Sequence, residues 1–493
     1  MSRKVIGPFN RVEGDLEVQL DIQDGVVADA WVVSPLYRGF ERMLVGKHPE
    51  DALVYTPRIC GICSVSQSIA AAKALAMAKD LSMPDNGRLA QNIILASENV
   101  SDHLTHFYLF FMPDFCRATY ASEPWFAAVE PRFKALKGTA MKEMLKPRAE
   151  FMHILGLLAG KWPHSLALQP GGTTKTVGKQ EQIKLLALIS GFRQYLERTV
   201  FGCPLAQLLE VKNRAGLFDL FASGPAAQSD FGQFLTLSDA LDLQSLGEGP
   251  SLFLSYGVYD LTPDAGANGT KSARLYRPGI VVNGAYQSFS QEAIWEDVSH
   301  SWMSAQPRPL HPFDGATLPD AERAEGYSWC KAPRLGGQPS EVGALARHVV
   351  NGHPLFEDLT PNGCGNVEAR IVARLFEIAE TVTAMDGWAR ELTPNDPICA
   401  HGSMEQDCQG FGLVEAARGS LGHWLKIKKG RILNYQIIAP TTWNFSPRDG
   451  EGVPGPLEKA LIGAKFRDGE SDQPASVQHI VRSFDPCMVC TVH

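Results

Sequence analysis

Two Cys-x-x-Cys pairs at opposite ends of the chain constrain the fold more than any other sequence feature. Cys60 and Cys63 form the first pair, and Cys487 and Cys490 form the second, close to the end of a 493-residue sequence. Four thiolates are the number that a tetrahedral sulfur site requires. A zinc ribbon separates its two pairs by roughly 15–20 residues, whereas almost the whole chain lies between these. We therefore expect one metal site assembled by the entire fold.

The composition excludes several classes of protein. With 46 Lys+Arg against 54 Asp+Glu, a net charge of −8 gives no basic face for nucleic acid. No apolar run approaches the roughly 20 residues that span a bilayer, and the first residues have no apolar core typical of a signal peptide. Ten cysteines in this length are too dilute for a disulfide scaffold and suit a reducing compartment. We expect a cytoplasmic protein whose six single cysteines are small core residues.

Hydrophobic periodicity predicts a helix-rich α+β fold, with long central helices and small β-sheets near the N- and C-terminal parts. Strands are expected in segment 4–33, where Asp24-Gly25 predicts a hairpin turn, and in 423–428 and 431–438. The expected helices cover 64–81, 88–112, 180–212 and 366–392. The segment of about 216–365 lacks sustained periodicity and is interpreted as an irregular α/β insertion. Because no clean linker interrupts the sequence, residues 1–493 are expected to form a single domain.

Polar residues near the two pairs could support a metal. The first pair precedes a predicted helix, whose positive dipole end lowers thiol pKa, and Arg58 could neutralise thiolate charge. Asp485 immediately precedes the second pair, and the terminal His493 offers an imidazole and a carboxylate. Fraying in solvent is the alternative for His493.

The predicted helix over 88–112 carries Asp102 and His106 one turn apart, hence on one face. From this segment alone, a solvated polar stripe or satisfied core histidines would explain them as well as a functional role would. Glu13 and Glu41 each lie beside an Arg, and such neighbours are mostly surface pairs of little energetic value. The sequence contains no phosphate-binding loop, dinucleotide fingerprint or H-E-x-x-H motif, so nucleotide-dependent chemistry has no support.

Seven motifs in a fixed order carry a family resemblance. They are Arg11-Val12-Glu13-Gly14, Arg38-Gly39-Phe40-Glu41, Arg58-Ile59-Cys60-Gly61-Ile62-Cys63, Asp102-His103-Leu104-Thr105-His106-Phe107-Tyr108, Ala417-Arg418-Gly419, Pro440-Thr441-Thr442-Trp443-Asn444, and Asp485-Pro486-Cys487 through His493. The set spans nearly the whole chain and resembles the large subunit of a nickel–iron hydrogenase, which splits dihydrogen heterolytically.

The resemblance implies a role for each matched position. The nickel thiolates would be Cys60, Cys63, Cys487 and Cys490. The second cysteine of each pair would also bridge to an iron that carries carbon monoxide and cyanide. Arg418 would lie over the open metal position, with Asp102 and Asp485 around it. Glu13 would relay a proton from Cys487, and Thr441 would donate a hydrogen bond to a cyanide.

The resemblance also implies a second metal ion and a second chain. Glu41, the carbonyl of Ile437 and His493 match ligands of a Mg²⁺ near the C-terminus. Electrons would leave through a small subunit that carries iron–sulfur clusters, so this chain would be its obligate partner.

Three departures from the common pattern point to a subclass. Gln67 replaces the usual His four residues after Cys63. Ile62 and Phe110 replace Val and Leu at the inner end of the gas channel, where larger side chains would admit dihydrogen more readily than dioxygen. Together they resemble the oxygen-tolerant, hydrogen-sensing subclass, whose members signal to a histidine kinase. Ala417 also replaces the usual Pro before Arg418.

Three alternatives remain open from the sequence. The first is an uptake hydrogenase that feeds electrons to a respiratory chain. The second is a relative in a quinone-reducing complex, although such relatives have lost the four cysteines. The third is a structural zinc protein with a four-cysteine site.

Overall fold

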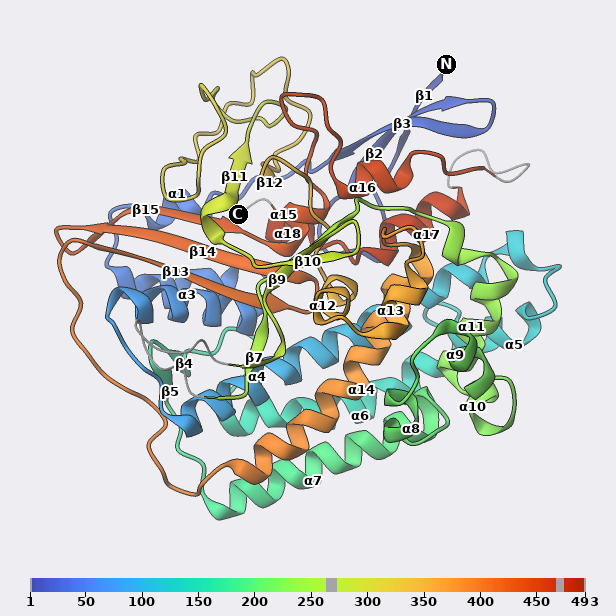
Figure 1. Cartoon of the computed structure of the whole chain (residues 1–493), viewed down its shortest axis with the longest axis horizontal. Helices are drawn as coiled ribbons and strands as arrows, with labels where there is room; N and C mark the ends of the chain where they lie inside the picture. The colour runs from blue at the N-terminus through green and yellow to red at the C-terminus, as the bar shows by residue number, and fades with distance from the viewer. Residues whose placement is uncertain (1, 263–272, 467–473, 492–493) are drawn as a thin grey trace.

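Four long helices form the centre of the molecule. The computed structural model of the chain describes residues 2–262, 273–466 and 474–491. The four helices are α4 (Asp85–Thr105), α6 (Thr139–Ala159), α7 (Lys179–Tyr195) and α14 (Val367–Glu391). Helices α4 and α7 each pack against both α6 and α14, so the four helices form one bundle (Figure 1). Most α14 side chains are buried, so this helix lies in the core.

A three-stranded antiparallel sheet covers helix α3 (Ser64–Ala78) on the other side of the molecule (Figure 1). Its strands, in spatial order, are β13 (Cys408–Ala416), β14 (Gly419–Lys428) and β15 (Arg431–Ile438). The close approach of β13 to α3 requires glycine, because a Cβ on Gly412 would lie 1.9 Å from the carbonyl oxygen of Ala70. The expected strands at 423–428 and 431–438 are confirmed.

The predicted N-terminal hairpin is confirmed and belongs to a second three-stranded sheet. Its strands are β1 (Ser2–Ile6), β2 (Glu17–Gln23) and β3 (Val26–Val33). The turn between β2 and β3 is made by Asp24 and Gly25, both with positive φ, as a two-residue hairpin turn demands.

Two predicted helices are interrupted where α-helical geometry was expected. After α4, the backbone continues as a π-helical turn (His106–Phe111) and a 3₁₀ turn (Met112–Cys116) before it turns away. The expected helix over 180–212 is α7, a π-helical turn (Leu196–Val200) and α8 (Leu205–Leu209). Such local widenings are not encoded by hydrophobic periodicity. The helix predicted over 366–392 is confirmed as α14, whose first turn is capped by Asn366.

The segment of about 216–365 mixes short helices with small antiparallel sheets, so sheets are not confined to the two ends of the chain. Its helices are α9 (Arg214–Leu220), α10 (Gly224–Gln228), α11 (Asp230–Ala240), α12 (Ala344–Asn351) and α13 (Pro354–Leu359). Its strands are β6 (Leu252–Ser255), β7 (Val258–Asp260), β8 (Arg274–Tyr276), β9 (Gly279–Val282), β10 (Ala285–Gln287), β11 (Ile294–Asp297) and β12 (Ala332–Leu335).

The remaining elements are short and lie mainly near the two ends of the chain. They are α1 (Phe40–Leu44), α2 (Ala52–Tyr55), α5 (Phe126–Phe133), β4 (Leu168–Gln169), β5 (Gly172–Thr173), α15 (Pro440–Asn444), α16 (Pro456–Leu461), α17 (Ala475–Ser483) and α18 (Met488–Thr491). One large apolar core extends from Ile6 to Cys490. The fold is thus helix-rich α+β, as predicted. Among the described helices, none combines the length and apolarity needed to cross a membrane.

Candidate metal centre

The two cysteine pairs meet in the interior, as predicted. Their four sulfur atoms all lie within 4.8 Å of one another. Across the pairs, Sγ–Sγ distances are 3.5 Å between Cys60 and Cys487 and 3.2 Å between Cys63 and Cys490. All four cysteines are buried. Of the other six, Cys203, Cys330 and Cys364 are buried, whereas Cys116, Cys399 and Cys408 are half-buried.

Local structure at each pair directs the sulfurs inward. Cys63 is the residue that directly precedes α3, and Cys487 directly precedes α18. The guanidinium of Arg38 links the two loops, because it donates to the carbonyl oxygens of Ile59, at the first pair, and of Val489, at the second. Arg58 does not serve the sulfurs as expected: its exposed side chain donates instead to a carbonyl one turn earlier.

The N-terminal loop is also paired with the second cysteine loop. The amide of Glu13 donates to the carbonyl of Pro486 at 3.3 Å, and the amide of Met488 donates to the carbonyl of Glu13 at 2.7 Å. Burial, followed by the charge of Cys60, raises the pKa of the half-buried Glu13 carboxyl. The structure therefore places a proton-binding side chain beside the cysteine cluster.

The charge state of the four thiols fits a metal site. Hydrogen bonds from the neighbouring thiols hold the pKa of Cys60 well below its ordinary value. The pKa values of Cys63, Cys487 and Cys490 are raised by their neighbours and by burial. Four sulfurs this close cannot all be ionised unless a cation balances them. Metal binding at such a site would release the remaining thiol protons, and soft thiolates suit nickel, iron or zinc.

Arg418 lies at the tip of the β13–β14 hairpin, and its guanidinium is buried beside the cluster. It donates to both carboxylate oxygens of Asp102 at 2.5 and 3.2 Å, and to the side chain and carbonyl of Asp485 at 3.2 and 3.1 Å. The charges of Cys487 and Cys60 act on this guanidinium too. The three residues predicted to surround the open metal position are thus brought together.

The two carboxylates differ in their electrostatic environment. Burial raises the pKa of Asp102 to about 7, although Arg418 opposes this effect. For Asp485, burial acts in the same direction but is outweighed. The positive charge of Arg418, the strongest of the opposing effects, holds the pKa of Asp485 below its usual range.

The interpretation of Asp102 and His106 as a solvated stripe is wrong. Both side chains are buried, and the Nε2 of His106 lies 2.7 Å from the carbonyl oxygen of Arg482. Burial lowers the pKa of His106 to about 3, so the imidazole is neutral. It links the π-helical turn after α4 to α17, the helix that precedes Cys487.

A buried ionic network behind Arg418 was not predicted. Arg347 donates to the carbonyl oxygens of Ala416 and Ala417, both at 3.0 Å, which fixes the hairpin tip. The same guanidinium pairs with Glu377 and Glu415. No local sequence signal marks these residues, because the contacts join α12, α14 and β13.

The side chains predicted to pack behind the cysteines or to line the gas channel occupy distinct places. Gln67 accepts a hydrogen bond from the Nε2 of His423 at 2.8 Å, and its amide nitrogen has no partner among the described residues. Ile62 is half-buried, and its backbone amide donates to the Sγ of Cys60. Phe110 lies half-buried in the π-helical turn after α4. That Ile62 and Phe110 line one gas passage stays a prediction.

The residues predicted for magnesium are partly brought together. Glu41 is buried and accepts a hydrogen bond from the amide of Ile437 at 2.7 Å, so the contact found runs through the N–H and not the carbonyl. The buried ammonium of Lys331 lies 3.5 Å from Glu41 and 3.1 Å from Glu296. His493 lies outside the described residues. Thr441 accepts a hydrogen bond from the amide of Cys487.

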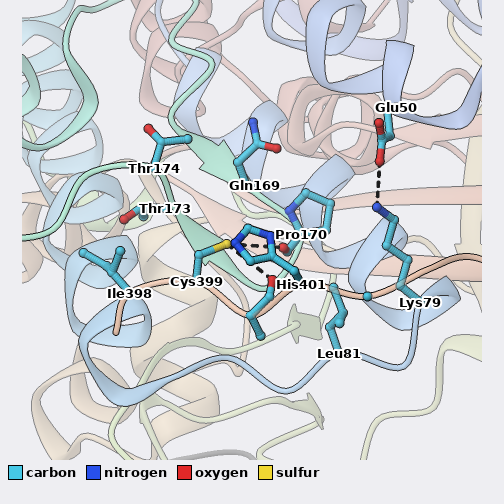
Figure 2. Close-up of a pocket in the computed structure, with 12 residues that line it drawn as sticks. Glu50, Lys79, Leu81, Gln169, Pro170, Thr173, Thr174, Ile398, Cys399 and His401 are labelled. Carbon is cyan, nitrogen blue, oxygen red and sulfur yellow. Dashed lines mark hydrogen bonds and ion pairs between the residues drawn. The ribbon is translucent and has the colours of Figure 1, made fainter. Parts of the chain in front are cut away.

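An open cavity of about 630 Å³ lies apart from these residues. Figure 2 shows its lining, where the ammonium of Lys79 pairs with Glu50 at 2.7 Å and the thiol of Cys399 faces the carbonyls of Pro170 and Ala400. None of the residues predicted to act in chemistry lines this cavity.

Comparisons with known proteins agree with the geometry. The profile of the nickel-dependent hydrogenase family matches residues 38–130 and 233–493. The chain is 28% identical to the large subunit of the periplasmic NiFeSe hydrogenase of Desulfomicrobium baculatum, over 99% of this chain and 94% of that protein. It is 29% identical to the hydrogenase-1 large chain of Citrobacter freundii, over 100% and 95% of the two chains.

A solved structure shares the whole fold. The Ni-Fe-Se hydrogenase of Desulfovibrio vulgaris Hildenborough in the reduced state superposes with a TM-score of 0.83 at 29% identity, covering 100% of both chains. The family profile and full-length coverage agree with the buried sulfur cluster. The chain therefore belongs to the nickel-dependent hydrogenase family, as a large subunit of an enzyme that splits dihydrogen.

Proposed function

We propose that this chain is the large subunit of an oxygen-tolerant, hydrogen-sensing nickel–iron hydrogenase. It would act in the cytoplasm with an iron–sulfur small subunit and signal to a histidine kinase. The observation that carries the underlying chemistry is the cluster of four buried sulfurs within 4.8 Å of one another, beside the guanidinium of Arg418.

The four cysteines would hold a nickel–iron centre. Such a centre supplies an open coordination position at which dihydrogen is polarised and split. Arg418 keeps a fixed positive charge near that position, and Asp102 and Asp485 hold its plane. Since all three side chains are buried, their charges act on the reacting atoms with little screening by water.

Glu13 is the proposed proton acceptor for Cys487. Its backbone is hydrogen-bonded to Pro486 and Met488, on either side of that cysteine. Its side chain is half-buried, so it connects the interior with the surface. A carboxylate in this place can take up a proton from the thiol and release it outward.

Two further groups are part of the proposal. Thr441 accepts from the amide of Cys487, which leaves its hydroxyl hydrogen for a cyanide ligand on iron. A Mg²⁺ would bind near Glu41, Ile437 and His493. Glu41 and Glu296 carry two negative charges against the single positive charge of Lys331, and carboxylate oxygens are the ligands that magnesium prefers.

The sensing role rests on Gln67, Ile62 and Phe110. Gln67 lies on α3 one turn after Cys63 and is held by His423. Ile62 lies within the first cysteine loop, and Phe110 in the π-helical turn beyond Asp102. Larger side chains at these two places would narrow a gas passage to the sulfur cluster.

Metal analysis and infrared spectroscopy test the proposed centre. Nickel, iron in excess of nickel because the small subunit adds its clusters, and infrared bands from carbon monoxide and cyanide are expected for the complex purified with its small subunit. Zinc in place of nickel, with no such bands, would identify a structural four-cysteine site and overturn the proposal.

An uptake hydrogenase is the second candidate, because a relative from Rhodobacter capsulatus, 27% identical over 100% of this chain, is an uptake hydrogenase large subunit. Deletion of this chain in its host separates the two roles. A sensor is required for hydrogen-induced transcription, whereas an uptake enzyme is required for hydrogen-driven oxygen consumption. Loss of hydrogen-driven oxygen consumption with hydrogen-induced transcription intact would overturn the sensing role.

A further inference from the structure

One buried carboxylate gathers the hydrogen-bond donors at the start of α3. Glu98, on α4, accepts from the backbone amides of Val65 and Ser66 at 2.9 and 3.0 Å. It also accepts from the hydroxyls of Ser64 and Ser66 and from the indole nitrogen of Trp162 at 2.9 Å. Its side chain thereby joins α3, α4 and the loop that contains Trp162.

The partners of Glu98 favour its ionised form. The two amides and the indole N–H can only donate, and they point at both carboxylate oxygens. Burial raises the pKa of Glu98 to about 7, against the effect of these hydrogen bonds. The carboxylate is therefore ionised in mildly alkaline solution.

The position of this charge relates it to the cysteine cluster. The helix that Glu98 caps begins at the residue after Cys63. A helix N-terminus stabilises a nearby anion. At the N-terminus of α3 that anion is the carboxylate of Glu98, which accepts from the amides of Val65 and Ser66. Glu98 is also one helical turn before Asp102 on α4, and its charge raises the pKa of Asp102.

We propose that Glu98 is a positioning residue for the metal centre: its five hydrogen bonds fix the start of α3 and hence Cys63, and its charge adds electron density behind that sulfur. It touches neither substrate nor ligand, and it acts through α3. This inference rests on the proposed nickel–iron centre.

The substitution Glu98→Gln tests the charge at nearly constant size. In the complex with its small subunit, at about pH 8.5, the carbon monoxide band is expected to move to higher wavenumber. Less electron density on iron weakens back-donation into carbon monoxide and so strengthens its bond. Activity is expected to fall roughly 10- to 100-fold, as for other groups that orient metal ligands.

Two controls separate this role from simple helix capping. Glu181 accepts from the amide of Gly178 at the start of α7, so Glu181→Gln removes the charge of a capping carboxylate elsewhere and is expected to leave the band in place. Glu98→Asp keeps the charge and is expected to give a smaller displacement than Glu98→Gln.

The outcomes are distinct. A band in Glu98→Gln that coincides with that of the wild type would overturn the positioning role while the proposed function stands. If Glu98→Gln does not fold, the double substitution Ser64→Ala and Ser66→Ala removes the two hydroxyl donors that join this carboxylate to α3. An unmoved band there would overturn the positioning role equally. Absence of the bands in the wild type itself would overturn both proposals.

Discussion

The side chains of Arg418 and Asp102 form a buried pair joined by two hydrogen bonds of 2.5 and 3.2 Å. Asp485, near the C-terminus, accepts hydrogen bonds from the same guanidinium through its carboxylate and its backbone carbonyl. The planar fork of arginine can satisfy these partners together, because its donors diverge in fixed directions. The pair thus sets the orientation of a positive charge beside the sulfurs.

Replacing Arg418 with Lys is expected to lower hydrogen oxidation by about 100-fold or more, the range for loss of one preorganised donor. A single ammonium cannot span Asp102 and Asp485 with the same geometry. Nickel content is expected to stay unchanged, since no cysteine is altered. Dye-linked hydrogen oxidation and metal analysis measure the two effects, and near-normal turnover would remove Arg418 from the site.

The substitution Glu13→Gln is expected to depress both hydrogen oxidation and H/D exchange with solvent. Gln preserves the size of the side chain and the backbone pairing with Pro486 and Met488, but it cannot take up a proton. Mass spectrometry of the exchanged gas provides the measurement. Asp15, two residues along the chain, gives a matched Asp15→Asn control with exchange expected to be unchanged. Unaffected exchange in Glu13→Gln would exclude the relay.

The sequence predicted those parts of the site that short motifs encode. The two cysteine pairs and Arg418 each lie in a local motif, and the structure brings them together. Hydrophobic periodicity likewise predicted α4 and α14, and the alanine-rich sequence after Cys63 predicted α3.

What the sequence did not reveal depends on contacts between distant segments. Arg347 holds the backbone before Arg418 from another helix, and no spacing rule relates the two. Glu98 and Trp162 are 64 residues apart in the chain. The role expected for Arg58 was wrong because a neighbouring position along the chain does not fix where a long side chain points. Tertiary packing decides these cases.

Asp114 joins segments near the two chain ends, so its loss is expected to lower the free energy of unfolding. Its buried carboxylate pairs with Arg11, two residues before Glu13, and with Arg482 of α17 at 2.6 Å. The substitution Asp114→Asn leaves two guanidinium groups without their counter-charge, which is expected to cost about 3–5 kcal/mol. Urea unfolding measures this loss. Asp386→Asn breaks the exposed pair with Arg390 and is expected to cost under about 1 kcal/mol; equal effects would contradict the prediction.

The double substitution Ile62→Val and Phe110→Leu tests the narrowed gas passage. Smaller side chains at both places are expected to admit dioxygen and to make hydrogen oxidation sensitive to air. Activity without oxygen is expected to remain close to that of the wild type, because neither side chain carries charge or binds the sulfurs. Comparing hydrogen oxidation with and without oxygen gives the result. Unchanged oxygen tolerance would show that these side chains do not gate the passage.

His348 predicts a pH dependence of stability. Its ring is buried and stacks on Phe356 with centroids 4.3 Å apart, and burial lowers its pKa from 6.5 to about 3. The unfolded chain therefore binds a proton near pH 6.5 that the folded chain refuses until about pH 3. The free energy of unfolding is expected to fall by about 1.4 kcal/mol for each pH unit below 6.5 from this group alone.

The substitution His348→Phe isolates that contribution, since Phe keeps the ring stack and cannot bind the proton. Glu380 lies 3.8 Å from His348, and burial raises its pKa to about 7. Its effect has the opposite sign in the same window, because the folded chain takes up that proton first. Between pH 6.5 and 5, the free energy of unfolding of the wild type is therefore expected to fall more steeply than that of His348→Phe. The difference in slope is about 1.4 kcal/mol per pH unit, the value for one proton. Unfolding midpoints measured across this range decide the matter, with His153→Gln on the exposed face of α6 as the control. Parallel slopes in wild type and His348→Phe would show that His348 is not the group responsible.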